Sequence, residues 1–303
     1  MTSPRHVLLT GATGFIGQAI TTALQRSGHT VHPGLSPRQR QSGGIPMDFA
    51  ADTQAAVWLP RLQGIDVVIN AVGVLRDTAA RPIDAVHHHT PVALFDACAQ
   101  AGVRRVIQIS ALGVQELPTR YARTKRAADD HLQGLSAQPG CPFTSAILRP
   151  SVVFGYGGDS SALFMNLARL PVVTLPEPVL RARLQPVAVT DLADGIAALV
   201  GDQAQQQGIL PCVGPEALTM AALIASLREQ CGRGPAQVLR LPGWLTRLSA
   251  RVGDWVPPSP WCSETLAMLA CDNTGDPTPL RTLIGRDAVH YRQLVARNWL
   301  PLP

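Results

Sequence analysis

Tyr121 and Lys125 are the residues of this chain best suited to acid–base chemistry. They stand four positions apart at the start of a stretch with helical periodicity, so both side chains are expected on one helix face. A phenol titrates near pH 10, so it exchanges a proton at neutral pH only where a nearby cation favours the phenolate. Lys125 would be that cation, and Ser110, at the end of an apolar run, could orient a reacting oxygen.

A glycine-rich loop near the start of the chain has the pattern of a dinucleotide-binding turn. It follows a short apolar run over 7–9 and opens a helical pattern that continues to Leu24. Its three glycines permit a tight turn, close approach of a pyrophosphate and close helix packing, and the helix N-terminus offers N–H groups to the phosphates. The cofactor contacts expected in this loop are Gly11, Thr13, Gly14, Phe15, Ile16 and Gly17.

The residues after this loop favour a phosphorylated ribose. An NAD-selective site places an acidic residue about twenty positions past the first glycine, but no Asp or Glu occurs here before Asp48. Ser36, Arg38 and Arg40 occupy that segment and could hold a 2′-phosphate. We therefore expect NADP(H), with NAD(H) as the alternative if the arginines are only solvated loop charges. Lys125 could hydrogen-bond the nicotinamide ribose.

The composition is that of a globular protein. Of the 303 residues 46% are hydrophobic, and the net charge of +5 comes with few aromatic residues, which gives no support to nucleic-acid binding. Six cysteines form no metal-ligand spacing, so we expect no bound metal and a reducing compartment. With no signal-peptide pattern and no apolar run of membrane-spanning length, a cytoplasmic location is expected.

Apolar runs alternate with helical patterns through the first half of the chain, which predicts an α/β fold with a doubly wound parallel sheet. Further strands are expected over 29–35, 66–70, 103–110 and 144–148. Thr90 and Pro91 predict a helix start, and Gly102 its end. We expect a nucleotide-binding domain over 1–155 completed by 185–214, and a smaller substrate or partner lobe from 156–184 and 215–303.

About the first 200 residues resemble the short-chain dehydrogenase/reductase superfamily, in its extended and atypical branches. Within these, the chain is most similar to the group related to the Rossmann-fold accessory subunit of respiratory complex I and to NmrA-like proteins. The motifs that carry the resemblance are the glycine loop, Asn70 to Gly73, Tyr121 with Lys125, 148–155, 185–187 and 190–193. The resemblance implies adenine contacts from Asp48 and Phe49 and cofactor contacts from Ala71, Val72 and Gly73. Asp129 also falls where relatives carry an acid.

Two positions depart from the pattern of active members. Ala111 follows Ser110 where a second hydroxyl is usual, and His87 stands where an asparagine is often found. Ten residues between Ser110 and Tyr121 also leave little of the loop seen in nucleotide-sugar enzymes. We therefore expect an NADP(H)-dependent oxidoreductase acting on an unidentified small carbonyl, alcohol or quinone-like substrate. The alternatives are a non-catalytic cofactor-binding accessory or redox-sensing protein and, less favoured, a sugar epimerase or dehydratase.

Three other patterns admit more than one interpretation. His87, His88 and His89 point in different directions on a helix, so they do not predict a metal site. The Gly155 to Gly158 run lacks the residues of a triphosphate loop and indicates a turn. Over 241–255, tryptophan and leucine recur at helical spacing beside arginines. We expect this stripe to face inward, the alternative being peripheral membrane contact.

Overall fold

The computed structural model describes residues 3–37, 39, 43–201, 205–255 and 262–299. The chain divides into two compact units. The first comprises Met1–Val114, Tyr121–Arg149 and Ala193–Leu210, and the second Gln115–Arg120, Pro150–Leu192 and Pro211–Pro303. In the described part of the chain, no helix is both long and apolar enough to span a bilayer.

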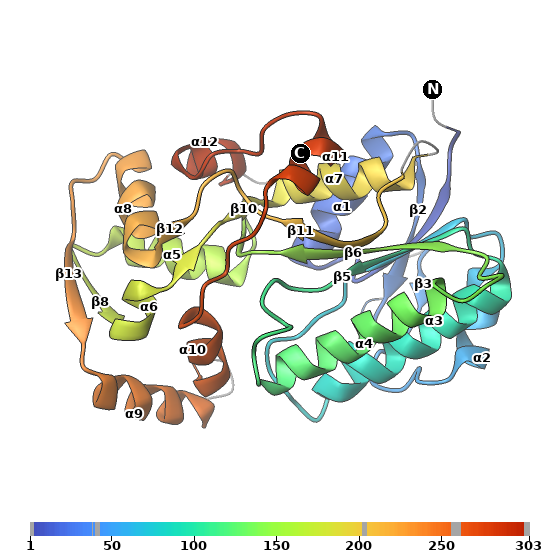
Figure 1. Cartoon of the computed structure of the whole chain (residues 1–303), viewed down its shortest axis with the longest axis horizontal. Coiled ribbons are helices and arrows are strands. Elements are labelled where there is room, and N and C mark those ends of the chain that lie inside the picture. Colours follow the sequence, from blue (N-terminus) through green and yellow to red (C-terminus); the bar gives the residue numbers. More distant parts are fainter. Residues whose placement is uncertain (1–2, 38, 40–42, 202–204, 256–261, 300–303) are drawn as a thin grey trace. The chain divides into compact units, whose positions relative to one another are not determined.

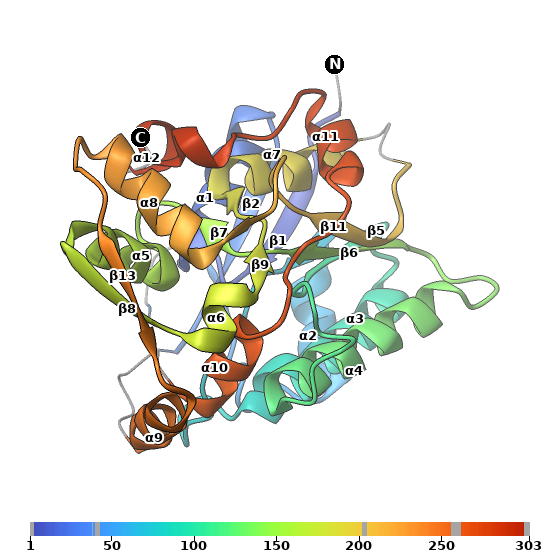
Figure 2. The ribbon, with the colours of Figure 1, turned by 60° about the vertical axis from the view of Figure 1, so that its left-hand side comes forward.

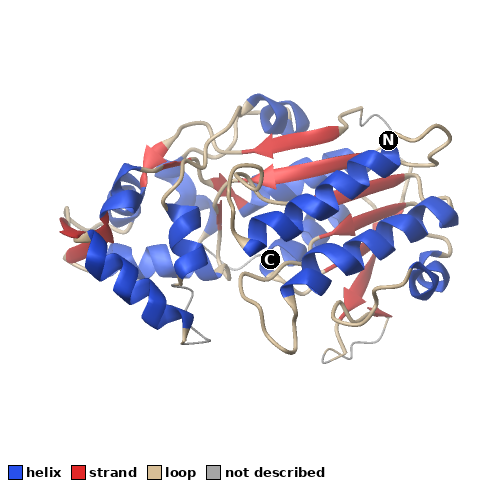
Figure 3. Ribbon diagram, turned by 60° about the horizontal axis from the view of Figure 1, so that its bottom comes forward, coloured by secondary structure: helices blue, strands red, loops and turns tan. Residues whose placement is uncertain are grey.

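A seven-stranded sheet organises the first unit (Figure 3). Its order is β11-β6-β5-β4-β1-β2-β3, and every neighbouring pair from β3 to β6 is parallel. The strands are β1 (His6–Thr10), β2 (Thr30–Leu35), β3 (Ile45–Pro46), β4 (Val67–Asn70), β5 (Arg105–Ile109), β6 (Thr144–Pro150) and β11 (Gly208–Cys212). In this order β2 and β3 lie on one side of β1, whereas β4 and β5 lie on its other side. The strand order therefore reverses between β1 and β4, and doubly wound sheets bind their ligands at such a switch point. The predicted doubly wound α/β fold is confirmed.

Helices cover both faces of this sheet (Figure 1). They are α1 (Phe15–Arg26), α2 (Ala55–Trp58), η1 (Leu59–Leu62), η2 (Ala85–His89), α3 (Thr90–Ala101), α4 (Arg120–Ser136) and α7 (Val189–Val200). On the face of α3 and α4, the core holds the fully buried Trp58, Leu94 and Phe95. Gly102 ends α3 in the left-handed region, with φ of 72°. The predicted cap at Thr90 is wrong, because η2 continues the helical path upstream and the Thr90 hydroxyl bonds the Phe49 carbonyl instead.

The second unit is built from short helices and two-stranded sheets (Figure 2). Its sheets pair β7 (Val153–Phe154) with β10 (Val187–Ala188), β8 (Val172–Pro176) with β13 (Gln237–Leu241), and β9 (Arg183–Leu184) with β12 (Leu218–Thr219). Its helices are α5 (Asp159–Arg169), α6 (Glu177–Arg181), α8 (Met220–Gln230), α9 (Gly243–Asp254), α10 (Ser263–Leu269), α11 (Thr278–Ile284), η3 (Tyr291–Gln293) and α12 (Leu294–Asn298).

The boundary between the units differs from the one expected from the sequence. Four stretches expected in the nucleotide-binding domain fall in the second unit, namely residues 115–120, 150–155, 185–192 and 211–214. For 150–155 and 185–192 the reason is local pairing: Val153 lies beside Val187 and Phe154 beside Ala188 in a separate sheet. Phe154 and Ala188 then join the core of the second unit, with Phe164 and Leu223.

Candidate active site

The glycine loop joins the end of β1 to the start of α1. Gly11 has φ of 71°, and a Cβ atom there would lie 2.9 Å from the carbonyl oxygen of Ala71. A Cβ at Gly17 would lie 2.8 Å from the Cα of Ala12 and closer still to the Gly11 carbonyl oxygen. Gly14 precedes α1 and, having no side chain, leaves the first N–H groups of the helix open to a phosphate. The loop therefore fits a dinucleotide pyrophosphate.

Buried polar side chains tie together the strand ends beneath this loop. The Thr10 hydroxyl donates to Oδ1 of Asn70 (2.6 Å), and Nδ2 of Asn70 donates to Oε1 of Gln108 (2.8 Å). These residues lie side by side at the carboxyl ends of β1, β4 and β5. The segment Ala71 to Gly73, which was expected to contact the cofactor, leaves the sheet at this point.

The residues expected to contact the adenosine part of the cofactor lie in loops that follow β1, β2 and β3. The hydroxyls of Thr13 and Ser36 both donate to Oε1 of Gln39, at 3.0 and 3.2 Å. Gln39 was not singled out from the sequence, because an amide in a loop carries no distinctive pattern. Asp48 accepts from the backbone N–H of Ala50 (2.9 Å). Phe49 packs edge-on against Trp58, and Arg38 and Arg40 lie outside the described residues.

Tyr121 and Lys125 lie on α4, which brings the predicted pair together. Tyr121 is half-buried, whereas Lys125 is buried and donates from Nζ to the carbonyl oxygen of Ile109 (2.9 Å). Lys125 also approaches the cofactor segment, because its Nζ is 3.4 Å from the position of a Cβ on Gly73. Burial lowers the pKa of Lys125 to about 8, and the nearby Asp129 carboxylate opposes that shift.

The phenol of Tyr121 is neutral in this environment. Burial, and secondarily the charge of Asp129, raises the pKa of Tyr121 to about 12. This differs from the expectation that Lys125 would favour the phenolate, because burial disfavours the charged phenolate and the Asp129 carboxylate repels it. Tyr121 is therefore held in the form that donates a proton.

His87 links the loop after β4 to the helix that carries Tyr121. Its Nε2 accepts from the backbone N–H of Val74 (2.9 Å), and its Nδ1 lies 3.2 Å from the Thr124 hydroxyl, which donates to the Tyr121 carbonyl oxygen. The imidazole ring meets the phenol ring at 89°, with centroids 5.1 Å apart. Burial and the charge of Lys125 lower the pKa of His87 to about 2, so the ring is neutral with its proton on Nδ1.

A buried ionic cluster around Asp129 holds the side chain of Ser110. Asp129 is fully buried and accepts from the Ser110 hydroxyl (2.6 Å) and from Nη2 of Arg149 (2.9 Å). Burial raises the pKa of Asp129, while Ser110, Arg149 and Lys125 oppose that shift. Since the Ser110 proton is directed at Asp129, the arrangement does not favour the expected role of Ser110 as a donor to a substrate oxygen.

The comparisons with known proteins agree with this geometry. The model of the NAD dependent epimerase/dehydratase family matches residues 7–210, more than half of the chain. The chain belongs to this family. This confirms the predicted resemblance to short-chain dehydrogenases/reductases with a Rossmann fold. The family supports dinucleotide binding, and the close-packed glycine loop is the part of the structure that fits it.

Curated relatives of this family member include enzymes and a respiratory subunit. The chain is 28% identical over 206 residues to a ceramide reductase of Caulobacter vibrioides, covering 64% of this chain and 59% of that protein. It is 29% identical over 251 residues to a divinyl chlorophyllide a 8-vinyl-reductase of Zea mays, covering 77% and 61%. It is also 26% identical over 205 residues to NADH dehydrogenase [ubiquinone] 1 alpha subcomplex subunit 9 of Mus musculus, covering 63% and 52%. The chain thus spans about three fifths of the length of the two reductases.

Solved structures of similar fold hold either form of the cofactor. Human epimerase family protein SDR39U1 with NADPH aligns with a TM-score of 0.72 at 17% identity, over 96% of this chain and 99% of that one. MoeE5 in complex with UDP-glucuronic acid and NAD aligns with a TM-score of 0.71 at 21% identity, over 97% of each chain. At these identities the likeness concerns the fold.

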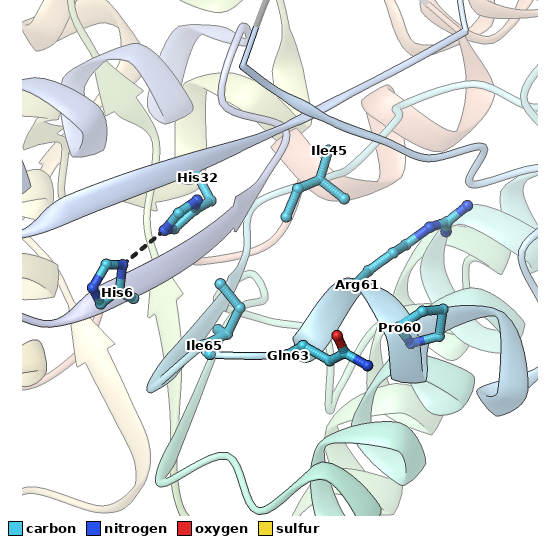
Figure 4. Close-up of a pocket in the computed structure, with 8 residues that line it drawn as sticks. His6, His32, Ile45, Pro60, Arg61, Gln63 and Ile65 are labelled. Carbon is cyan, nitrogen blue, oxygen red and sulfur yellow. Dashed lines mark hydrogen bonds between the residues drawn. The ribbon is translucent and has the colours of Figure 1, made fainter.

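Neither the His87–His89 run nor a separate hollow of the first unit adds a ligand site to this arrangement. His87 is buried, His89 is exposed, and the described residues contain no cluster of three or more side chains able to hold a metal ion. A hollow in the first unit is lined by His6, His32, Ile45, residues 60–61 and residues 63–65 (Figure 4). Its lining includes His6, the first residue of β1, whereas the glycine loop follows Thr10, the last. The hollow is therefore separate from the dinucleotide loop.

Proposed function

We propose that this protein is an NADPH-dependent reductase of a small carbonyl or quinone-like compound, or a dehydrogenase of the corresponding alcohol. The observation that carries the proposal is that Tyr121 lies on the same helix as the buried Lys125, whose Nζ is 3.4 Å from the position of a Cβ on Gly73 of the cofactor segment. A bound nicotinamide would supply or accept the hydride. Two relatives are named as reductases, which supports the reducing direction of the proposed reaction.

The residues of the chain would handle the proton. When hydride adds to the carbonyl carbon, the O–H bond of Tyr121 breaks and its proton passes to the substrate oxygen, which completes the alcohol. The phenolate then takes a proton from solvent, which the half-buried Tyr121 can reach. Lys125 would hold the nicotinamide ribose, and its charge would stabilise the transient phenolate.

We infer a preference for NADP(H) over NAD(H). The sequence offers no carboxylate for a ribose 2′-hydroxyl between Gly17 and Asp48, and the side chains of Thr13, Ser36 and Gln39 gather there as neutral hydrogen-bonding groups. A comparison of thermal shifts with NADPH and NADH tests this preference, because a ligand that binds only the folded state raises the melting temperature. A larger shift with NADH would contradict it.

The test of the reaction is NADPH oxidation by the purified full chain with a panel of carbonyls and quinones. Tyr121→Phe should lower kcat by about 10²–10⁴-fold and leave the NADPH-induced thermal shift unchanged. Tyr291→Phe, at a tyrosine in the second unit, is the matched control and should leave kcat unchanged. If Tyr121→Phe turned over at the parent rate, the assigned role of Tyr121 would be wrong.

A second candidate is a cofactor-binding protein without turnover, such as an accessory or redox-sensing protein. The observation that favours it is that two of the expected catalytic groups donate hydrogen bonds to the protein itself. The Ser110 hydroxyl donates to Asp129, and Nζ of Lys125 donates to the carbonyl oxygen of Ile109. Its signature would be cofactor-dependent stabilisation with no turnover across the panel. A cytoplasmic location stays a prediction under either candidate, and cell fractionation tests it.

A further inference from the structure

We propose that α9 docks the second unit onto an anionic lipid surface. Three large apolar residues of α9 and the residue that caps its C-terminus are exposed: Trp244 by 64%, Leu248 by 54%, Val252 by 57% and the cap Trp255 by 87%. They are called the α9 surface below. In Figure 1, α9 follows β13, and α10 lies beside it within the same unit. The proposal is independent of the reaction assigned to the first unit.

The opposite side of α9 is the one that packs on the protein. Thr246, Ala250 and Gly253 are buried, and the Thr246 hydroxyl donates back to the carbonyl oxygen of Pro242 (3.1 Å). At about 100° per residue, the α9 surface spans roughly 80° of arc, and the three buried residues lie on the far side of the helix. The expectation that the apolar stripe faces inward is therefore wrong. The small side of the helix, with Ala250 and Gly253, packs closely on the second unit, and the large side chains of the α9 surface are exposed.

Charges beside the α9 surface indicate what covers it. Arg247 and Arg251 are exposed and flank one edge of the apolar arc. The acidic residue of the helix is engaged elsewhere, because the Asp254 carboxylate accepts from the backbone N–H and the hydroxyl of Ser263 (2.8 and 2.6 Å). Tryptophan and leucine bordered by arginine is the arrangement of a helix lying in a bilayer interface, with the arginines at anionic headgroups.

A second copy of the chain is a poorer occupant. A two-fold contact would bring the same surface of both copies together. With the two helices antiparallel, Arg247 and Arg251 of one copy would approach the arginines of the other along the edge of the contact. With the helices parallel, no carboxylate of α9 outside the Asp254–Ser263 contact would face them. An anionic bilayer satisfies both the apolar arc and these charges.

The experiment is co-sedimentation of the full chain with vesicles of equal parts phosphatidylcholine and phosphatidylglycerol, and with vesicles of phosphatidylcholine alone. We expect binding to the mixed vesicles that weakens with salt. Trp244→Ser and Leu248→Ser should each weaken it about tenfold or more, from the loss of one buried apolar side chain. Arg247→Gln and Arg251→Gln should each weaken it about fivefold on mixed vesicles, without effect on phosphatidylcholine alone.

Leu75→Ser is the matched control, since Leu75 is 45% exposed in the first unit, and it should bind like the parent. Thermal melting should show every variant folded, because the replaced side chains are exposed. The proposal is overturned if the parent does not bind the mixed vesicles, or if Leu75→Ser weakens binding as much as Leu248→Ser. It is also overturned if sedimentation equilibrium shows a dimer that Leu248→Ser dissociates.

Discussion

Gly17→Ala should strain the glycine loop, because the new methyl group meets backbone on two sides. Its Cβ would lie 2.8 Å from the Cα of Ala12 and closer to the carbonyl oxygen of Gly11. Nonbonded carbon atoms normally meet at about 3.5–4.0 Å, so the loop or α1 must move by about 1 Å. Overpacking of this kind costs about 1–3 kcal/mol.

The same substitution at Gly134 is the control. Gly134 is an exposed residue of α4, and a Cβ there would have no neighbour within 4 Å. In a helix, alanine is favoured over glycine by about 0.5–1 kcal/mol. The two variants add one methyl group each, yet their effects on stability should have opposite signs.

The assay is urea unfolding with and without NADPH. Gly17→Ala should lower the unfolding midpoint and diminish the stabilisation by NADPH, since the moved backbone N–H groups no longer fit the phosphates. Gly134→Ala should raise the midpoint and keep the full NADPH effect. If Gly17→Ala matched the parent in both respects, the close packing inferred between loop and helix would be refuted.

Two further predictions concern the groups buried around Tyr121. Because the pKa of His87 is lowered to about 2 from an ordinary 6.5, the folded state binds fewer protons than the unfolded chain between these values, and its stability falls as the pH drops below 6.5. His87→Asn should flatten this part of the curve of unfolding free energy against pH, and a curve unchanged from the parent would count against a neutral buried imidazole. Asp129→Ala should cost about 3–5 kcal/mol, because it leaves Arg149 buried without its carboxylate, whereas Arg26→Ala at an exposed ion pair should cost about 1 kcal/mol or less. Equal losses in urea unfolding would contradict this contrast.

Much of the first unit was predictable because its signals are local. The strand expected over 144–148 appears as β6, and the helix expected from Thr90 to Gly102 appears as α3. The two-residue strand β3 was missed, since Ile45 and Pro46 are too few to show any periodicity. The upstream turn η2 was missed for a similar reason, because its π-type hydrogen bonds follow no ordinary helical repeat.

Within the candidate site, the spacing along the sequence predicted which residues share a helix but not which hydrogen bonds their side chains form. Tyr121 and Lys125 lie on one helix as expected. The partners of Ser110 and His87 were not predictable, because Asp129 and Val74 reach them only through packing of separate elements.

The sequence by itself determined the dinucleotide loop and the parallel sheet. These depend on glycine positions and on the period of apolar residues, which are properties of neighbours along the chain. Only the tertiary structure decided the direction in which the pKa of Tyr121 shifts and which side of α9 faces outward. A pKa depends on the water and charge removed by distant segments, and a helix face is buried only if another element arrives to cover it.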